Sequence, residues 1–463
     1  MKRNFGILGL YIALAATGGQ SAFAASTAQT YEAREKALNY LVAHQDASGR
    51  IGSGVSDTAY ALLALTSEWR TNDTKPAAPH GPLGQTGHAS DFVLTASQQA
   101  AVAGAVSYIE ATAQRNSPTS VHWNGEYHAN AETALATMAL LQAAQSSYSS
   151  GYAACRLDCV VPQGAASGVT IQTLADSAFN YLAFTQIGIG SPEKGLWGHI
   201  DGVNGAAETV DTALVGLSSI SSDRIYAGGL SVTARGSLAN GVTLLSQYAQ
   251  TPGAYTYADF GITHLTNFLS TVPGLIVQIA TGNNGPSSVQ NNLTYAYLNS
   301  QWQTTPTDHD SVFGTQLYAG NKGNFFAMWM LEQIASGTDY IGFNSTGHTN
   351  AFNYDVPFYN KITNLGDCGS GESAPSGGCN WLADYNQWLV QHQNADGSFI
   401  YTGMAPDVYD TIATTAMAGS ILVGYSDTPG VPEPALWSMM ILGFGLVGAA
   451  VRQRRSLPSD HGA

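Results

Sequence analysis

The chain has 463 residues, of which 44% are hydrophobic and only 11% are Asp, Glu, Lys or Arg. Disordered chains are rich in charge and poor in apolar residues, so this composition predicts a folded body of one large domain or two to three ordinary ones. Acidic residues outnumber basic residues 32 to 17, which gives a formal charge of −15. A nucleic-acid-binding protein needs a basic face to neutralise phosphates, so nucleic acid is excluded as the expected partner.

Residues 1–24 have the pattern of a secretory signal peptide. Lys2 and Arg3 precede an apolar run over residues 5–16, and Ala22-Phe23-Ala24 matches an A-x-A cleavage site. The run is shorter than the roughly 20 apolar residues that a membrane-spanning helix needs. We therefore expect signal peptidase to remove this segment during export.

The middle of the chain, residues 25–428, contains a repeated motif of an aromatic residue, Leu, Gln and Gly. Two copies share one spacing: Tyr40-Leu41, Gln45 and Gly49 in the first, and Trp388-Leu389, Gln393, Gly397 and Phe399 in the last. A copy with a longer insert spans residues 181–197, and a weaker one spans residues 108–123. Apolar residues recur at helical spacing before a Gly-containing turn, so each copy predicts an amphipathic helix followed by a loop.

An acidic residue and a small-residue apolar segment follow each copy. The acids are Asp57, Glu132, Asp211 and Asp410, and each is followed by Thr. A helix that is apolar all round is buried, so these segments predict inner helices. About six pairs of an outer and an inner helix fit between residues 35 and 425, with the weakest pattern at residues 229–271.

The first element resembles the QW motif of the prenyltransferase and squalene-cyclase repeat, which reads aromatic-Leu-x3-Gln, a short spacer, then Gly-x-aromatic. The resemblance implies an all-α fold, an α/α toroid of about six helical hairpins around a central cavity. A tetratricopeptide-like open solenoid is the alternative, but its period of about 34 residues is much shorter than the spacing of the inner-helix starts.

The resemblance also suggests chemistry that the residues do not complete. Class II terpenoid cyclases of the family protonate an alkene with an Asp in D-x-D-D-T-A, and residues 208–213 keep that framework with Val210 at the position of the proton donor. No Cys stands at an inner-helix start for the zinc set of the protein prenyltransferases, and the thioester sequence G-C-G-E-Q is missing. We therefore expect no cofactor and no metal, and a terpenoid cyclase is the least favoured enzyme.

The four acids permit two interpretations. An acid in the first turn of a helix accepts backbone N–H bonds and opposes the helix dipole, which explains one acid per inner helix without any function. Alternatively, Asp57, Glu132, Asp211 and Asp410 converge at one mouth of the toroid, where carboxylates act as acid and base on a sugar polymer or hold a cation.

Further candidate site residues lie in two loops, residues 122–128 and 197–201, and at the aromatic end of the last motif copy. His128 and His199 are candidates for catalysis, and Trp123, Tyr127, Trp197 and Phe399 are candidates for a substrate-binding platform. The alternative is that the aromatic residues at the end of the motif only cover the helix ends.

Four cysteines form two close pairs in Gly/Ser/Ala-rich loops, Cys155 with Cys159 and Cys368 with Cys379. An oxidising compartment favours local disulfides, so we predict these two bonds.

The C-terminal segment, residues 429–463, has a three-part order. A Pro-Glu-Pro sequence at residues 432–434 precedes an apolar stretch over residues 435–451, and Arg452, Arg454 and Arg455 follow. The order resembles the PEP-CTERM sorting signal, which an exosortase recognises in Gram-negative bacteria that make extracellular polysaccharide. We expect a transmembrane helix that holds the chain in the inner membrane before processing; a simple membrane anchor is the alternative.

The leading hypothesis is a non-enzymatic cell-surface or extracellular-matrix protein whose toroid binds an extracellular ligand, with exopolysaccharide as the candidate partner. The alternative is a polysaccharide lyase or hydrolase with a carboxylate-lined toroid cavity, and a terpenoid cyclase-like enzyme comes third.

Overall fold

The computed structural model describes residues 27–67, 94–124, 129–145, 156–188, 191, 193–198, 207–226, 228–247, 252–257, 265–266, 268–281, 293–294, 296–298, 323–339, 381–400 and 411–422.

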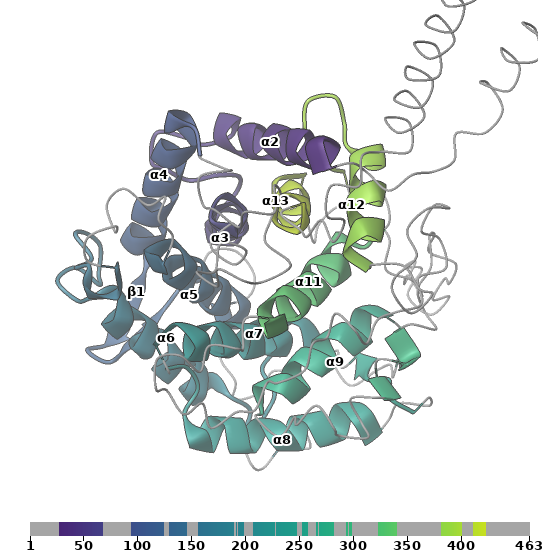
Figure 1. Ribbon diagram of the computed structural model, residues 1–463. Helices are drawn as coiled ribbons and strands as arrows, with labels where there is room; N and C mark the ends of the chain where they lie inside the picture. Colours follow the sequence, from purple (N-terminus) through teal and green to yellow (C-terminus); the bar gives the residue numbers. More distant parts are fainter. Residues whose placement is uncertain are drawn as a thin grey trace, which may run out of the picture.

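Six helices of the described chain form a closed inner ring. They are α3 (Val55–Leu65), α5 (Ala129–Gln145), α7 (Thr209–Tyr226), α9 (Phe268–Ala280), α11 (Phe325–Asp339) and α13 (Thr411–Ile421). Each helix contacts the next in this order, and α13 packs back against α3 (Figure 1). The first and last repeats are therefore neighbours in space.

Contacts near the helix ends show that α3, α5 and α13 run parallel to one another. Close to the end of α5, Gln142 Nε2 donates to Leu63 O at 2.9 Å and to Thr66 Oγ1 at 2.8 Å, at the end of α3. Gly419, close to the end of α13, lies against the side chain of Ala64. The N-terminal ends of α3, α5 and α13 thus share one end of the ring, which we call the loop end.

The outer layer consists of α2 (Thr27–Ala43), α4 (Ala96–Thr112), α6 (Ile171–Thr185), α8 (Val232–Gln247) and α12 (Trp381–His392). Helix α2 packs on α13, α4 on α3, α6 on α5 and α8 on α9, while α2 also contacts α4 and α12. Two short antiparallel pairs join the loops: β1 (Gln114–Ser117) with β2 (Ser120–His122), and β3 (Thr256–Tyr257) with β4 (Leu265–Thr266). A 3-10 turn, η2 (Arg156–Asp158), precedes α6.

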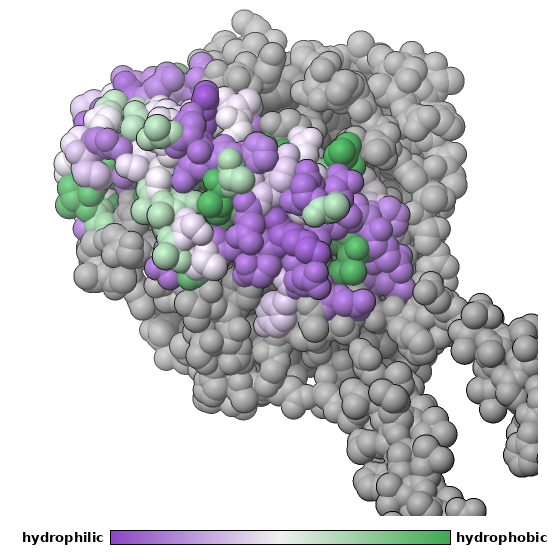
Figure 2. Space-filling model, turned by 90° about the horizontal axis from the view of Figure 1, so that it is seen from above, coloured by the Kyte–Doolittle hydropathy of each residue, from purple (hydrophilic) through white to green (hydrophobic). Residues whose placement is uncertain are grey.

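Residue size and polarity explain the two layers. Every residue of α3 from Asp57 onward and every residue of α13 after its first is buried. Helix α4 instead buries one face, at positions spaced as a single helical stripe. Seen from above α2, the described surface is mainly hydrophilic with isolated hydrophobic residues (Figure 2). The inner helices are built mainly of small and apolar residues, which explains why so few residues of the chain are charged.

The predicted α/α toroid is confirmed. The pair with the weakest pattern, residues 229–271, forms α8 and the start of α9. Among the described residues, no helix is long and apolar enough to cross a membrane. The predicted signal peptide and the apolar stretch of residues 435–451 lie outside those residues, so the domain limits at residues 24 and 428 remain predictions.

Candidate functional site

The motif glutamine joins neighbouring outer helices. Gln45 Nε2 donates to Gly49 O in its own loop at 3.0 Å and to Ala101 O in α4 at 2.9 Å. The same two bonds recur at Gln186, to Gly195 O at 2.9 Å and Ala234 O at 3.0 Å, and at Gln393, to Gly397 O at 3.1 Å and Ala33 O at 2.7 Å. The last glutamine connects the final repeat to the first and so closes the outer layer.

The motif glycine allows the loop to approach the next outer helix. Gly49 has φ +90°, and a Cβ at this position would lie 2.1 Å from Gly104 O in α4. A side chain would therefore be strained by the backbone conformation and would also overlap the helix. Gly253 also has a positive φ and a close backbone neighbour, and it marks a further copy, Gly253-Ala254-Tyr255, which the sequence pattern missed because no aromatic-Leu pair stands at the motif spacing before the glutamine.

A threonine of the inner helix accepts the backbone N–H of the residue that ends each motif. The bonds are Ile51 to Thr58 at 3.1 Å, Trp123 to Thr133 at 3.0 Å, Trp197 to Thr212 at 2.9 Å, Tyr255 to Thr271 at 3.3 Å and Phe399 to Thr415 at 3.0 Å. This repeated bond fixes how the inner helices correspond to one another.

The correspondence corrects the alignment of the last repeat. Because Phe399 bonds Thr415, the residue equivalent to Asp57 is Thr414 and not Asp410. Asp410 lies one helical turn earlier in sequence and outside the described residues. The Asp-Thr pair at residues 410–411 resembled the earlier repeats in sequence, but the hydrogen-bonded position is four residues further on.

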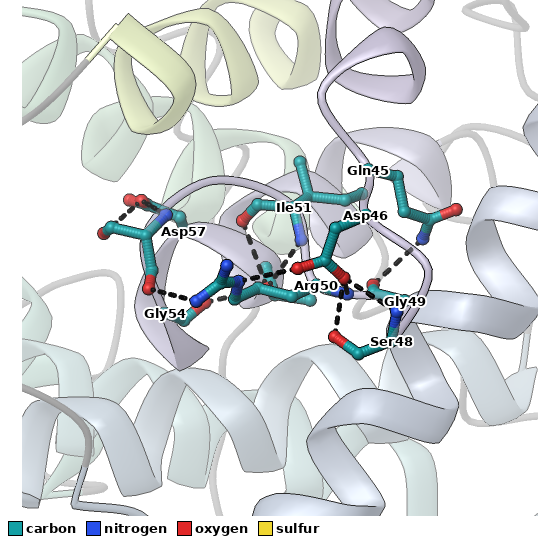
Figure 3. Close-up of polar contacts among 10 residues, drawn as sticks. Gln45, Asp46, Ser48, Gly49, Arg50, Ile51, Gly54 and Asp57 are labelled. Atoms are coloured by element: carbon teal, nitrogen blue, oxygen red, sulfur yellow. Dashed lines mark hydrogen bonds and ion pairs between the residues drawn. The ribbon is translucent and has the colours of Figure 1, made fainter.

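The acid layer consists of Asp57, Glu132 and Asp211, which stand at equivalent positions on three consecutive inner helices. They are 7%, 4% and 2% exposed. Asp57 Oδ2 accepts from the Ser53 backbone N–H and from its hydroxyl, each at 2.7 Å, so this carboxylate ties the loop to the start of α3 (Figure 3). The helix-start interpretation therefore applies to Asp57.

On α7 another carboxylate takes the capping position. Glu208 Oε2 accepts the backbone N–H of Asp211 at 2.5 Å and is itself 3% exposed. Glu208 therefore caps the Asp211 backbone N–H at the start of α7. The sequence pattern placed residue 208 in the cyclase-like framework of residues 208–213 but did not indicate this bond.

The ring interior holds a group of aromatic side chains close to the acid layer. The rings of Tyr60 and Trp329 meet edge-on with centroids 5.2 Å apart, and the ring centroids of Phe326 and Trp329 are 6.1 Å apart. Tyr60 belongs to α3 and Trp329 to α11, which α13 separates in the ring, so both side chains point into the interior.

Burial raises the pKa of Tyr60 well above its ordinary value, and the negative charges of Asp57 and Asp211 raise it further. Desolvation disfavours the phenolate, and nearby carboxylates add like-charge repulsion. Two members of the acid layer, from α3 and α7, thus act on one interior hydroxyl. The convergence of all four acids at one mouth of the toroid stays a prediction, because Asp410 lies outside the described residues.

The aromatic platform expected from the sequence is not formed by the described residues. Trp123, Trp197 and Phe399 are fully buried, and the two indole N–H groups donate to outer-helix carbonyls, Ile109 O and Leu182 O, each at 2.7 Å. These residues are packing groups between loop and helix. Tyr127, His128 and His199, the other candidates, lie outside the described residues.

The remaining site predictions are not decided. Cys159 is buried, whereas Cys155, Cys368 and Cys379 lie outside the described residues, so both disulfide pairings stay predictions. Within the ranges that the structure describes, no group of three or more His, Cys, Asp or Glu side chains is placed to hold a metal ion.

The chain is similar to solved structures of a type II terpene cyclase. The type II terpene cyclase MstE from Scytonema, in its apo form, is 13% identical with a TM-score of 0.44, over 85% of this chain and 98% of that chain. An apo variant of the same enzyme matches at 11% and 0.43, over 86% and 97%. At these values the likeness carries no argument about activity, and the toroid rests on the closed ring of inner helices.

Residues 430–455 match the PEP-CTERM protein-sorting motif. This motif directs a chain to an exosortase for processing, and it implies export across the inner membrane to the cell surface or the extracellular space. No curated protein matches the chain. The sorting motif and the helical ring together define an exosortase-sorted, exported toroid protein.

Proposed function

We propose that this chain is an exported cell-surface or extracellular-matrix protein whose toroid binds an extracellular ligand in the ring interior, at the acid layer. The observation that carries the proposal is the edge-on contact of Tyr60 with Trp329 in the interior, one helical turn after Asp57 of the acid layer on α3. Carboxylates and aromatic faces that converge in a concave fold are the groups that ligand sites commonly combine.

Binding is favoured over the two enzymatic alternatives. A lyase or hydrolase was expected to place Trp123 and Trp197 in a groove, but both are fully buried in packing positions. A cyclase of this framework needs a proton donor where the chain has Val210. Exopolysaccharide remains the candidate ligand, because exosortase sorting accompanies extracellular polysaccharide.

The test uses the processed, epitope-tagged protein in an exosortase-containing host. The measured quantity is the fraction of protein retained in the extracellular matrix compared with the fraction free in the medium. Asp211→Asn keeps the side-chain shape but removes the charge, and we expect it to shift protein from the matrix into the medium. Asp158→Asn, at an exposed position in η2, is the matched control and should behave as the original protein.

Removal of residues 430–455 separates sorting from binding, because that variant should not reach the surface at all. Circular dichroism of each purified variant establishes that it is folded. Retention of Asp211→Asn equal to that of Asp158→Asn would contradict ligand binding at the acid layer and leave the sorting conclusion in place.

A further inference from the structure

Among the described residues, three of the buried hydrogen-bond donors that have no partner lie at the start or within the first two turns of α11 and α13. They are Asn324 Nδ2 at the start of α11, Trp329 Nε1 within α11 and Thr414 Oγ1 in α13, and their residues are at most 2% exposed. A buried donor left without a partner costs about 1–3 kcal/mol. Each such group in a folded protein therefore calls for an explanation, such as a ligand that completes the bond.

Thr414 belongs to the same interior layer as the acids. The bond from Phe399 to Thr415 places Thr414 at the position where α3 carries Asp57. The equivalent residue on α9, Ser270, donates its hydroxyl to Tyr255 O at 2.7 Å. The hydroxyl of Thr414 lacks such a bond, so the α13 position differs from its counterpart in having an unused donor.

The indole N–H of Trp329, within the Tyr60–Trp329 pair, is a second donor without a partner. Its ring meets Tyr60 across the interior, and Tyr60 feels the charges of Asp57 and Asp211. In the first two turns of the inner helices, α3, α5 and α7 thus carry carboxylate acceptors, whereas α11 and α13 carry the unused donors of Trp329 and Thr414.

We propose that this interior site binds a neutral sugar unit, an inference that rests on the proposed function and specifies its ligand. Each hydroxyl of a sugar both donates and accepts hydrogen bonds, so it satisfies a carboxylate on one side and an N–H or O–H group on the other. The C–H face of a pyranose ring is apolar and packs on aromatic rings such as Tyr60 and Trp329.

The charge of the site predicts its selectivity. Glu132 and Asp211 are almost fully buried, so a second carboxylate brought close to them would meet repulsion in a medium of low dielectric constant. An acidic sugar should therefore be rejected, because a like charge in the site acts against the wrong ligand. A neutral hexose or an N-acetylated hexosamine meets no such penalty.

The test is a titration of the purified, processed protein with defined monosaccharides, followed by saturation-transfer NMR and calorimetry. The probes are glucose, galactose, mannose, N-acetylglucosamine and glucuronic acid. We expect at least one neutral sugar to bind and glucuronic acid to bind at least tenfold more weakly. Thr414→Val should lower the affinity for the bound sugar by about 3–10-fold, the size expected for one neutral hydrogen bond.

Two further variants make the test specific. Trp329→Phe keeps an aromatic ring but removes the N–H donor, and it should also weaken sugar binding. Thr243→Val, at an exposed position of α8, is the matched control and should leave the affinity unchanged. The substitution Thr414→Val removes only an unpaired hydroxyl, so we expect the variant to fold. Its thermal unfolding curve checks this expectation.

The outcomes separate this inference from the proposed function. If the protein is retained in the matrix through Asp211 but binds none of the sugars, the sugar assignment is overturned and ligand binding stands. Sugar binding that is equal in Thr414→Val and Thr243→Val would also overturn it. If matrix retention does not depend on Asp211 either, both proposals fail.

Discussion

Replacement of Gly397 by Ala should lower the free energy of unfolding by more than the conformational strain at that residue accounts for. Gly397 has φ +92°, a conformation that costs a residue with a side chain about 1–2 kcal/mol. In addition, the new Cβ would lie 2.3 Å from Lys36 O and 2.6 Å from its carbonyl carbon, in the backbone of α2. Overpacking of this kind typically adds about 1–3 kcal/mol, so we expect a total loss of about 2–5 kcal/mol.

The reasoning has a matched control within the chain. Gly168 has nearly the same conformation, with φ +88°, but a Cβ there would meet nothing within 4 Å. Gly168→Ala should therefore cost only the conformational strain of about 1–2 kcal/mol. Urea denaturation of both purified variants gives the two free energies of unfolding, and hydrogen exchange in α2 locates the change. A loss for Gly397→Ala no larger than that for Gly168→Ala would refute the claim that the loop closes the ring against α2.

Two further predictions concern the hydrogen bond of the last repeat and the free energy of unfolding at acidic pH. Thr415→Val orphans the buried N–H of Phe399 and should cost about 1–3 kcal/mol in urea denaturation, whereas Thr411→Val should stay within about 0.5 kcal/mol; equal losses would contradict the corrected alignment. Hydrogen bonds from nearby serines lower the pKa of Asp46 and of Asp396 in the folded protein. Each carboxylate therefore stabilises the fold fully at a pH above its unfolded pKa of about 3.9. This stabilisation is lost as the pH falls through the lower pKa of the folded state. The difference in unfolding free energy between the original protein and a variant with both residues changed to Asn should therefore shrink below about pH 4; a difference that is constant down to pH 2 would contradict this cause.

The architecture was predictable because it depends on local patterns. The spacing of Gln45 and Gly49 is repeated at Gln393 and Gly397. It reflects a loop that must turn at the glycine, accept a hydrogen bond from the glutamine of its own motif and contact the next outer helix. Such requirements leave a trace in each repeat. The Gly253 copy was missed because it keeps the glutamine, the glycine and the aromatic residue but lacks the aromatic-Leu pair that opens the motif.

The candidate site was less predictable because its parts come from distant segments. Asp410 and Thr411 look like the acid and threonine of earlier repeats, and only the bond from Phe399 to Thr415 shows the true correspondence. The meeting of Tyr60 with Trp329 joins two helices that are not neighbours in the ring. Nothing in the local pattern of either helix indicates that contact.

Burial also decides the role of the aromatic residues in a way that composition cannot. Trp123 ends its motif beside polar residues, which is typical of a binding loop as well as of a packing position. Its indole donates to Ile109 O at 2.7 Å, and the side chain is fully buried. A hydrogen bond to the outer helix, rather than the residue type, distinguishes the two interpretations.

The most direct test of the account is a crystal structure of the processed protein soaked with the neutral sugar that binds best. We predict electron density for one sugar ring in the toroid interior, with an oxygen within hydrogen-bond distance of Trp329 Nε1 and another near the carboxylate of Asp211. An interior that remains free of sugar density, with the Tyr60–Trp329 contact unchanged, would contradict the central claim that the ring interior is the ligand site.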